Sequence, residues 1–193
     1  GGALSNGGSV FDWMRHTLAL SDVRDLEAAA GALAPDEHGL TILPFFVGER
    51  SPGWAPDATA TISGLRQNST PIEILRAGLE SVAYRFAQIY AGLAPQVPQA
   101  RHFIASGGGL LRSPTWTQIM ADVLGMPVIA SAEHEASSRG NALLALEVLG
   151  VIDNAARLPG VADSTCAPNP AHHAIYARAV DRQRDLYRRL FAP

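Results

Sequence analysis

The sequence contains no lysine, because all 15 of its basic residues are arginines. Several mechanisms depend on a lysine: the phosphate-binding P-loop, the strand lysine of protein kinases and Schiff-base catalysis. The chain can carry none of these, whatever its glycine-rich segments suggest. Whole classes of nucleotide-dependent and carbonyl-processing enzymes are therefore excluded.

Cysteine is almost absent as well. The single Cys166 allows no internal disulfide, and no Cys/His cluster has the spacing of a zinc site. His134 lies between Glu133 and Glu135, but three adjacent residues cannot all converge on one ion. We therefore expect no metal ligands in this chain and a reducing, cytoplasmic setting.

Long apolar runs and an excess of basic charge are also missing. No stretch of 18 apolar residues and no signal-peptide pattern occurs, so we expect no membrane partner. The net charge of −3 argues against a nucleic-acid partner. The 193 residues suffice for one domain with a sizeable core. The chain opens on GGALSNGG without an initiator methionine, which indicates a piece of a longer protein.

The most informative stretch is His102 to Leu124. The apolar run from Phe103 to Ala105 predicts a short strand, three glycines predict a tight turn, and Ser113 with Pro114 predicts the start of a helix. Glycines remove every Cβ, so a flat ligand can lie against the backbone near the positive end of that helix. The pattern favours a nucleotide site, and a purely structural turn is the alternative.

A second clear boundary opens a long core helix. Thr70, Pro71 and Glu73 supply an N-cap, a first-position proline and a capping-box acid, and apolar residues then recur by threes and fours. Arg76 and Glu80 lie off this apolar seam, where an i, i+4 ion pair accounts for them.

The segment from Leu40 to Pro56 differs from its surroundings. Pro44 interrupts the apolar run from Ile42 to Val47, so a regular central strand is not expected there. Glu49 and Arg50 follow in a glycine- and proline-rich loop. We expect this pair to hold the loop through an ion pair, with contact to a ligand as the alternative.

Two further strands are predicted, near Ala58 and near Val128. We expect both to share one sheet with the Phe103 strand. The flanking helices should begin at Thr70, Ser113 and Ala136. Gly140 would let the last of these helices approach the sheet closely. A terminal amphipathic helix with a solvated, arginine-rich face should follow Asn169 and Pro170.

Three ordered blocks of sequence resemble the carboxy-terminal domain of the FGGY family of carbohydrate kinases. They are LPFFVGERSP at 43–52, Gly64-Leu65 followed by ILRA at 74–77 and LESVA at 79–83, and SGGGLLRSP at 106–114 with EAS at 135–137. The resemblance covers nearly the whole chain. Within the family, the chain looks most like the bacterial gluconokinase type.

The resemblance implies an α/β fold of the actin-like ATPase (RNase H-like) type, with a mixed sheet flanked by helices. Residues 1–193 would be the second of two such domains, truncated at its start, and the sugar-binding first domain would be absent. In this family ATP is bound mainly by the second domain. The implied ligands are ATP, Mg²⁺ and a sugar or sugar acid such as gluconate. The protein could be a homodimer or a monomer, and the sequence does not decide between them.

The resemblance also assigns cofactor-binding positions. They are Gly64, Asn68, Gly107, Gly108, Gly109 and Arg112. The three consecutive glycines match the family's adenosine motif, and the arginine falls where a polar side chain reaches the adenine or ribose. The first two positions match a loop that lines the nucleotide site before the long helix.

No catalytic residue is assigned. In the family, the aspartate that takes the proton from the sugar hydroxyl and the acidic phosphate loop both lie in the first domain. Asp57 and Asp122 are the nearest alternatives here, but one matches a non-catalytic turn and the other lies in the last turn of a core helix.

The function that the sequence predicts is the ATP-binding half of a sugar kinase, inactive by itself. A xylulokinase-like or glycerol-kinase-like member and a non-catalytic actin-like nucleotide-binding or assembly module are the alternatives. A Rossmann oxidoreductase is disfavoured, because SGGGLLRSP is not G-x-G-x-x-G and no acid ends a following strand at the expected distance.

Overall fold

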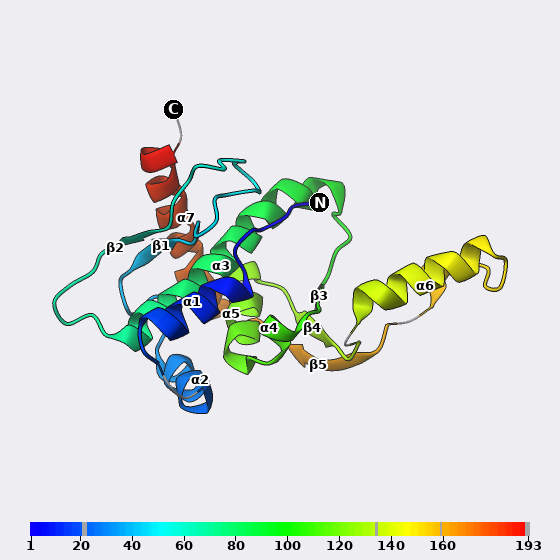
Figure 1. The fold of residues 1–193 in the computed structure, drawn as a ribbon, viewed down its shortest axis with the longest axis horizontal. Coiled ribbons are helices and arrows are strands. Elements are labelled where there is room, and N and C mark those ends of the chain that lie inside the picture. The colour runs from blue at the N-terminus through cyan, green and yellow to red at the C-terminus, as the bar shows by residue number, and fades with distance from the viewer. Residues whose placement is uncertain (21–22, 134, 159, 192–193) are drawn as a thin grey trace.

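One long helix, α3 (Pro71–Leu93), runs through the middle of the structure (Figure 1). The computed structural model describes residues 1–20, 23–133, 135–158 and 160–191. The start of α3 is as the sequence predicts, because Thr70 and Glu73 form a complete capping box. The Thr70 hydroxyl accepts from the Glu73 amide at 3.3 Å, and the Glu73 carboxylate accepts from the Thr70 amide at 2.7 Å.

Four helices pack around α3: α1 (Gly8–Thr17), α2 (Val23–Ala32), α5 (Pro114–Leu124) and α7 (Pro170–Phe191). Every residue of α3 from Leu75 to Arg85 is buried as a result. The buried surface of α3 is therefore wider than the apolar seam that the sequence predicts. Arg76, Glu80 and Arg85 lie off the seam, yet their side chains are buried too, because neighbours cover this helix on all sides.

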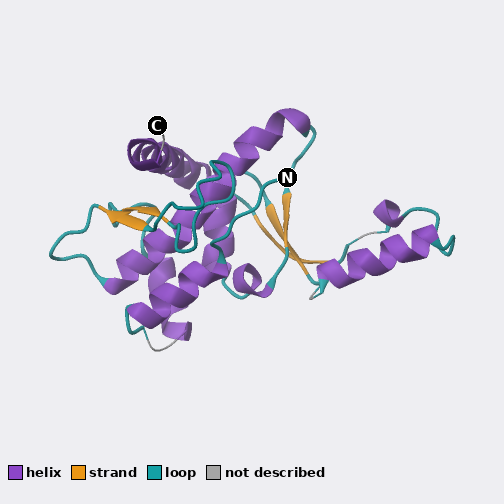
Figure 2. Ribbon diagram, turned by 45° about the horizontal axis from the view of Figure 1, so that its top comes forward, coloured by secondary structure: helices purple, strands orange, loops and turns teal. Residues whose placement is uncertain are grey.

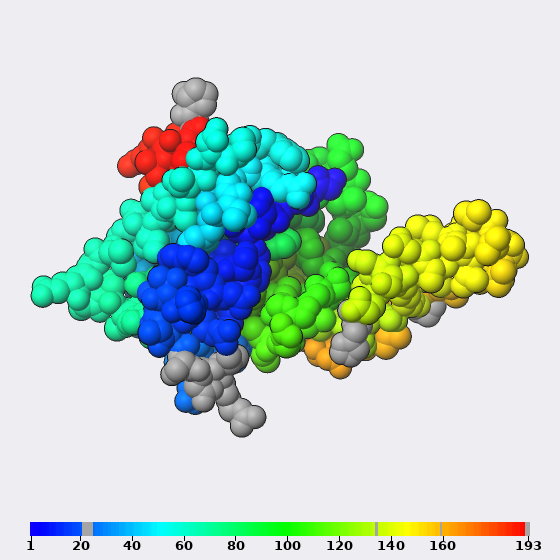
Figure 3. Space-filling model, in the orientation of Figure 1, coloured from blue at the N-terminus to red at the C-terminus, as the bar shows by residue number. Residues whose placement is uncertain are grey.

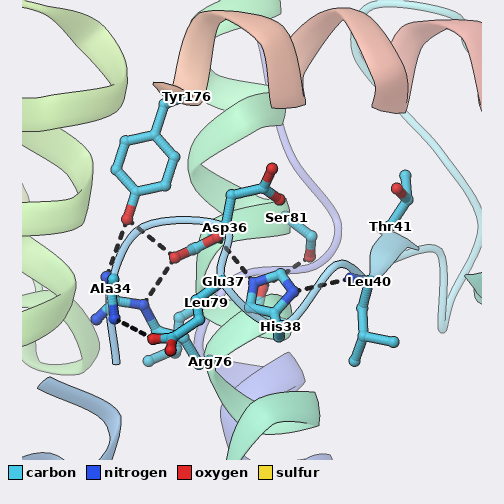
Figure 4. A network of polar contacts seen from close by, with 12 residues as sticks. Ala34, Asp36, Glu37, His38, Leu40, Thr41, Arg76, Leu79, Ser81 and Tyr176 are labelled. Atoms are coloured by element: carbon cyan, nitrogen blue, oxygen red, sulfur yellow. Dashed lines mark hydrogen bonds and ion pairs between the residues drawn. The ribbon is translucent and has the colours of Figure 1, made fainter. Parts of the chain in front are cut away.

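Glu80 is fully buried and is the centre of a polar network. Figure 4 shows His38, Arg76 and Tyr176, three of the residues in this network. One carboxylate oxygen accepts from Arg76 Nε at 2.7 Å and from the Tyr176 hydroxyl at 2.9 Å. The other accepts from the Tyr84 hydroxyl at 2.8 Å and lies 3.0 Å from His38 Nε2. Burial by itself raises the pKa of the Glu80 carboxyl, but His38 and Arg76 together outweigh it, and the pKa is lowered.

The hydrogen bonds of His38 fix its tautomer. The Leu40 amide donates to His38 Nδ1 at 3.0 Å, so that nitrogen carries no proton. The proton therefore lies on Nε2 and is donated to Glu80. His38 is a neutral donor in this network, and Arg76 supplies the positive charge that balances the buried carboxylate.

The strands form two separate sheets (Figure 2). Strands β1 (Thr41–Leu43) and β2 (Thr61–Ser63) pair antiparallel, with Ile42 opposite Ile62. As predicted, β1 stops before Pro44. The expectation that the strand near Ala58 joins the main sheet is wrong, because this segment, β2, finds its partner in β1.

The main sheet is mixed, with the order β3-β4-β5. Strands β3 (Phe103–Ala105) and β4 (Val128–Ser131) share this sheet, as predicted. They are parallel neighbours, and Phe103 lies opposite Val128. The connection between them contains α4 (Gly108–Leu111) and α5. Strand β5 (Ala162–Cys166) pairs antiparallel with β4. The short helices η1 (Ala94–Gln96) and η2 (Ala155–Arg157) lie in other connections.

Helix α6 (Ala136–Val148) projects from the rest of the structure (Figures 1 and 2). None of its residues is buried, and Val148 is 87% exposed. A Cβ built on Gly140 would have no neighbour within 4 Å. The prediction that this helix flanks the sheet, with Gly140 at a close approach, is therefore wrong for the described chain. The chain turns away from the sheet after β4, and the helix contacts η2 (Ala155–Arg157) instead of the sheet.

Helix α7 carries the predicted solvated face. Arg184 pairs with Asp181, and Arg188 pairs with Asp185, one turn apart on exposed positions. The opposite face buries Tyr176 in the core. Although α3 and α7 are long, none of the described helices combines the length and apolar character that crossing a membrane requires.

We expect Glu80→Gln to lower the free energy of unfolding by about 3–5 kcal/mol, the usual cost of removing one partner from a buried ion pair. The substitution leaves Arg76 without a counter-charge and places an amide donor among groups that donate to Glu80. Denaturant unfolding measures the effect. Glu73→Gln, in the first turn of the same helix, is the matched control and should change little, because glutamine can also complete a capping box. Equal stabilities of the two variants would contradict the central role of Glu80.

Candidate functional site

A cavity of about 310 Å³ lies between α1 and the segment formed by α4 and the start of α5. Figure 3 shows the surfaces of α1 (blue) and of this segment (green) side by side. Two of the predicted cofactor-binding residues, Gly109 and Arg112, line the cavity. The structure thus joins the glycine turn to a helix that lies about 100 positions earlier in the sequence.

Of the three predicted glycines, Gly109 lines the cavity, whereas Gly107 and Gly108 are not among its lining residues. Gly107 has a φ of +97°, a left-handed conformation that favours glycine, as expected at such a turn. A Cβ on Gly108 would lie 3.5 Å from the Arg112 guanidinium carbon, so that side chain covers Gly108. A Cβ on Gly109 would lie 3.8 Å from the Cα of Gly8. Two glycine backbones therefore approach one another here.

Helix α1 contributes polar side chains that the sequence analysis did not select. Asp12 and Arg15 lie one turn apart and line the cavity together with Phe11. A carboxylate can accept hydrogen bonds from an amino group or from ribose hydroxyls, and a guanidinium can stack on a planar base. The sequence signal that could have pointed to this wall is the glycine-rich GGALSNGG at 1–8, whose last residue, Gly8, begins α1.

The first turn of α5 is occupied by protein groups. Glu27 accepts from the Ser113 hydroxyl at 2.8 Å and from the Thr115 amide at 2.7 Å, and Ser113 accepts from the Trp116 amide as the predicted N-cap. Trp116 donates its ring N–H to the Leu79 carbonyl. The positive end of this helix is therefore satisfied by Glu27, and the cavity wall is rigidly held.

The structure does not bring Gly64 and Asn68 to this cavity. Gly64 follows β2 with a φ of +92°, and a Cβ there would lie 2.7 Å from the Gly39 carbonyl oxygen, so close packing accounts for this glycine. Asn68 is exposed in the turn before α3. In Figure 1 this loop and α4 lie on opposite sides of α1.

The Glu49 loop is held by buried contacts, in line with the structural interpretation, but its partner is not the expected one. Glu49 forms an ion pair with Arg85 of α3 and accepts from the Tyr187 hydroxyl at 2.7 Å, whereas Arg50 is exposed. The Arg85 guanidinium lies 5.1 Å from the ring centre of Phe45 and 5.2 Å from that of Tyr187. Burial lowers the pKa of Arg85, and Glu49 opposes that shift.

The two acids considered for catalysis lie outside the cavity. Asp122 is buried and accepts from the Asn169 amide at 2.7 Å and from Gln118 Nε2 at 2.8 Å, and His172 Nδ1 lies 2.9 Å away. It therefore fixes the start of α7. Asp57 is exposed in a loop.

Within the described residues, one cluster has the composition of a metal site, namely Asp36, His38 and Glu80. Both ring nitrogens of His38 and both oxygens of Glu80 already have protein partners, and Asp36 pairs with Arg182. These groups are therefore not free to bind an ion. His134 lies outside the described residues.

Comparison with known proteins gives consistent results. Residues 1–147 match a family model that is described as "FGGY family of carbohydrate kinases, C-terminal domain". A gluconokinase from Bacillus licheniformis is 32% identical over 167 residues, which cover 80% of this chain and 32% of that protein. A glycerol kinase from Acidovorax sp. (strain JS42) is 35% identical over 161 residues, covering 78% of this chain and 31% of that protein.

The fold recurs in a solved structure of ligand-bound xylulose kinase from Lactobacillus acidophilus. The TM-score is 0.90 with 26% identity, and the match covers 99% of this chain and 39% of that one. The mixed sheet flanked by helices is thus the actin-like ATPase fold of these kinases. The chain spans about a third of the length of the curated relatives it matches.

The contact with Glu49 predicts that the Tyr187 hydroxyl loses its proton at a higher pH than an ordinary tyrosine does. Burial, and then the hydrogen bond to Glu49, raise the pKa of Tyr187 to about 12 from an ordinary value of 10.0. The folded state thus favours the protonated phenol, and this stabilisation is complete below pH 10 and is lost as the pH rises through about 12. The difference in tyrosinate absorbance between the wild type and Tyr187→Phe should have its midpoint near pH 12. A midpoint near pH 10 would contradict the buried contact.

Proposed function

The chain belongs to the FGGY family of carbohydrate kinases, and we propose that it is the nucleotide-binding half of an ATP-dependent kinase acting on a sugar or sugar acid. In this proposal residues 1–193 form one domain, and a further domain of the full-length protein binds the sugar. The observation that carries the proposal is the cavity beside the glycine turn, which has a backbone wall on one side and Asp12, Arg15 and Arg112 around it.

The shape of the cavity suits the adenosine part of a nucleotide. Gly8 and Gly109 leave one wall without side chains, so a planar base can approach the backbone closely. Arg112 can stack on that base, and Asp12 can accept hydrogen bonds from its amino group or from the ribose. The volume of about 310 Å³ lies at the lower end of the usual range for ligand pockets.

Phosphoryl transfer needs positioning and charge stabilisation more than a protein nucleophile. The groups of this chain would bind and orient the adenosine, and the general base would come from the sugar-binding domain. Mg²⁺ prefers six oxygen ligands, and Asp12 is the single carboxylate at the cavity that the described contacts leave available. The phosphates of the nucleotide, rather than this wall, would therefore hold the metal.

For the acceptor we propose gluconate, because gluconokinases are among the similar relatives. Glycerol and xylulose are the alternatives, since a glycerol kinase reaches 35% identity and a xylulose kinase shares the fold. Phosphorylation assays of the full-length protein with these three acceptors would decide between them.

A non-catalytic assembly module is the second candidate. It is favoured by the apolar residues that α6 exposes, among them Leu144 and Val148, which could pair two copies of the chain in a homodimer. The absence of ATP consumption with every acceptor, in a full-length protein that still binds ADP, would favour this candidate over the kinase.

We expect Gly109→Val to abolish ADP binding in the full-length protein while the fold is kept. The added side chain would enter the cavity, where the nearest atom to the new Cβ is a backbone carbon 3.8 Å away. Calorimetric titration measures binding and thermal melting measures folding.

Gly92→Val is the matched control. Gly92 is also a helical glycine; its Cβ would meet nothing within 4 Å, and it does not line the cavity. Unchanged ADP affinity in a folded Gly109→Val variant would contradict the nucleotide site.

We further expect residues 1–193 alone to show no sugar-dependent ATP consumption, because in this proposal the general base belongs to the sugar-binding domain. A coupled ADP-release assay with gluconate, xylulose or glycerol is the measurement. Turnover by the purified chain would show that the catalytic groups lie within it and would overturn the division of labour proposed above.

A further inference from the structure

A second, much smaller cavity lies between the amino-terminal segment 4–6 and the loop 44–50. Its volume is about 10 Å³, which is the space that one water molecule needs. Asn6 and Arg85 both line it, and they are 5% and 1% exposed. Asn6 Oδ1 and Arg85 Nε are buried side-chain atoms that find no hydrogen-bond partner among the described residues.

The orientation of the Asn6 amide is fixed by its other contact. Its nitrogen donates to the Gly48 carbonyl oxygen at 3.0 Å, and a carbonyl can only accept. The amide oxygen must therefore be the atom that remains without a partner. Two hydrogen bonds between Ala3 and Ser51 hold the same segment against the loop: the Ser51 amide donates to the Ala3 carbonyl oxygen, and the Ala3 amide donates to the Ser51 hydroxyl, both at 2.9 Å.

The orientation of the Arg85 guanidinium is fixed as well. Its terminal nitrogens donate to Glu49 and, at 2.9 Å, to Gln88. The ring centres of Phe45 and Tyr187 lie 5.1 Å and 5.2 Å from the central carbon of the guanidinium. The Nε–H group therefore cannot turn to another acceptor without breaking these contacts.

We propose that one ordered water molecule occupies this cavity, accepting from Arg85 Nε–H and donating to Asn6 Oδ1. Water is the small species that meets both demands, since it donates and accepts. A halide would accept from Arg85 but would face the lone pairs of Asn6. A metal cation would suit Asn6 but would face the positive guanidinium.

The water would link two parts of the chain that have no direct contact at these atoms. Asn6 belongs to the segment that leads into α1, and Arg85 lies in the middle of the core helix α3. The site would therefore fix the entry to α1 against α3 through a buried, fully satisfied polar network. It does not depend on the nucleotide proposal.

A crystal structure of the full-length protein that shows ordered waters tests the site. We expect one isolated density peak about 2.7–3.2 Å from both Asn6 Oδ1 and Arg85 Nε. Arg76 Nε is the internal control, because this group, which is also buried, donates to Glu80 and should have no water beside it. An empty cavity, or an Arg85 Nε bonded to a protein acceptor, would overturn the proposal.

Two further crystals sharpen the test. In Asn6→Leu, which lacks the acceptor, the peak should disappear; persistence of the peak would show that Asn6 does not hold it. A crystal soaked in bromide should give no anomalous signal at the site, and a signal there would identify an anion site and overturn the proposal. If Asn6→Leu does not fold, the wild-type map and the bromide soak still decide the question.

Discussion

The buried carboxylate of Glu80 is the interaction on which the arrangement of helices depends. A charge in the interior is tolerated only when it is paired and hydrogen-bonded, and Glu80 meets this condition through groups from three parts of the chain. His38 comes from the connection after α2, Arg76 from α3 itself and Tyr176 from α7. A displacement of any of them would leave a buried charge without its partners, so this network defines how α2, α3 and α7 pack.

Arg85 serves the same purpose farther along α3, with the charges reversed. Its partner Glu49 belongs to the loop after β1, and Tyr187 of α7 completes the contact. The core helix thus presents a buried negative group and a buried positive group to different neighbours. Each pairs with segments far away in the sequence, which explains how a helix with charged side chains can be buried over eleven consecutive residues.

The candidate nucleotide cavity follows from this framework. α1 and α5 both pack on α3, and their separation leaves a space beside the glycine turn. Glu27 of α2 caps the start of α5, so the wall is held by protein groups before any ligand binds. The backbone of Gly109 forms the open side of the space, while Asp12 and Arg112 supply polar contacts at its rim.

The sequence by itself determined the features that depend on neighbouring residues: the capping box at Thr70, the end of β1 before Pro44 and the left-handed turn at Gly107. Its motifs also identified the family. Only the tertiary structure decided which distant groups meet, namely Arg85 as the partner of Glu49, β1 as the partner of β2, and α1 as the second wall of the cavity. The physical reason is that local backbone preferences are encoded within a few residues, whereas long-range pairing depends on how all the helices pack together.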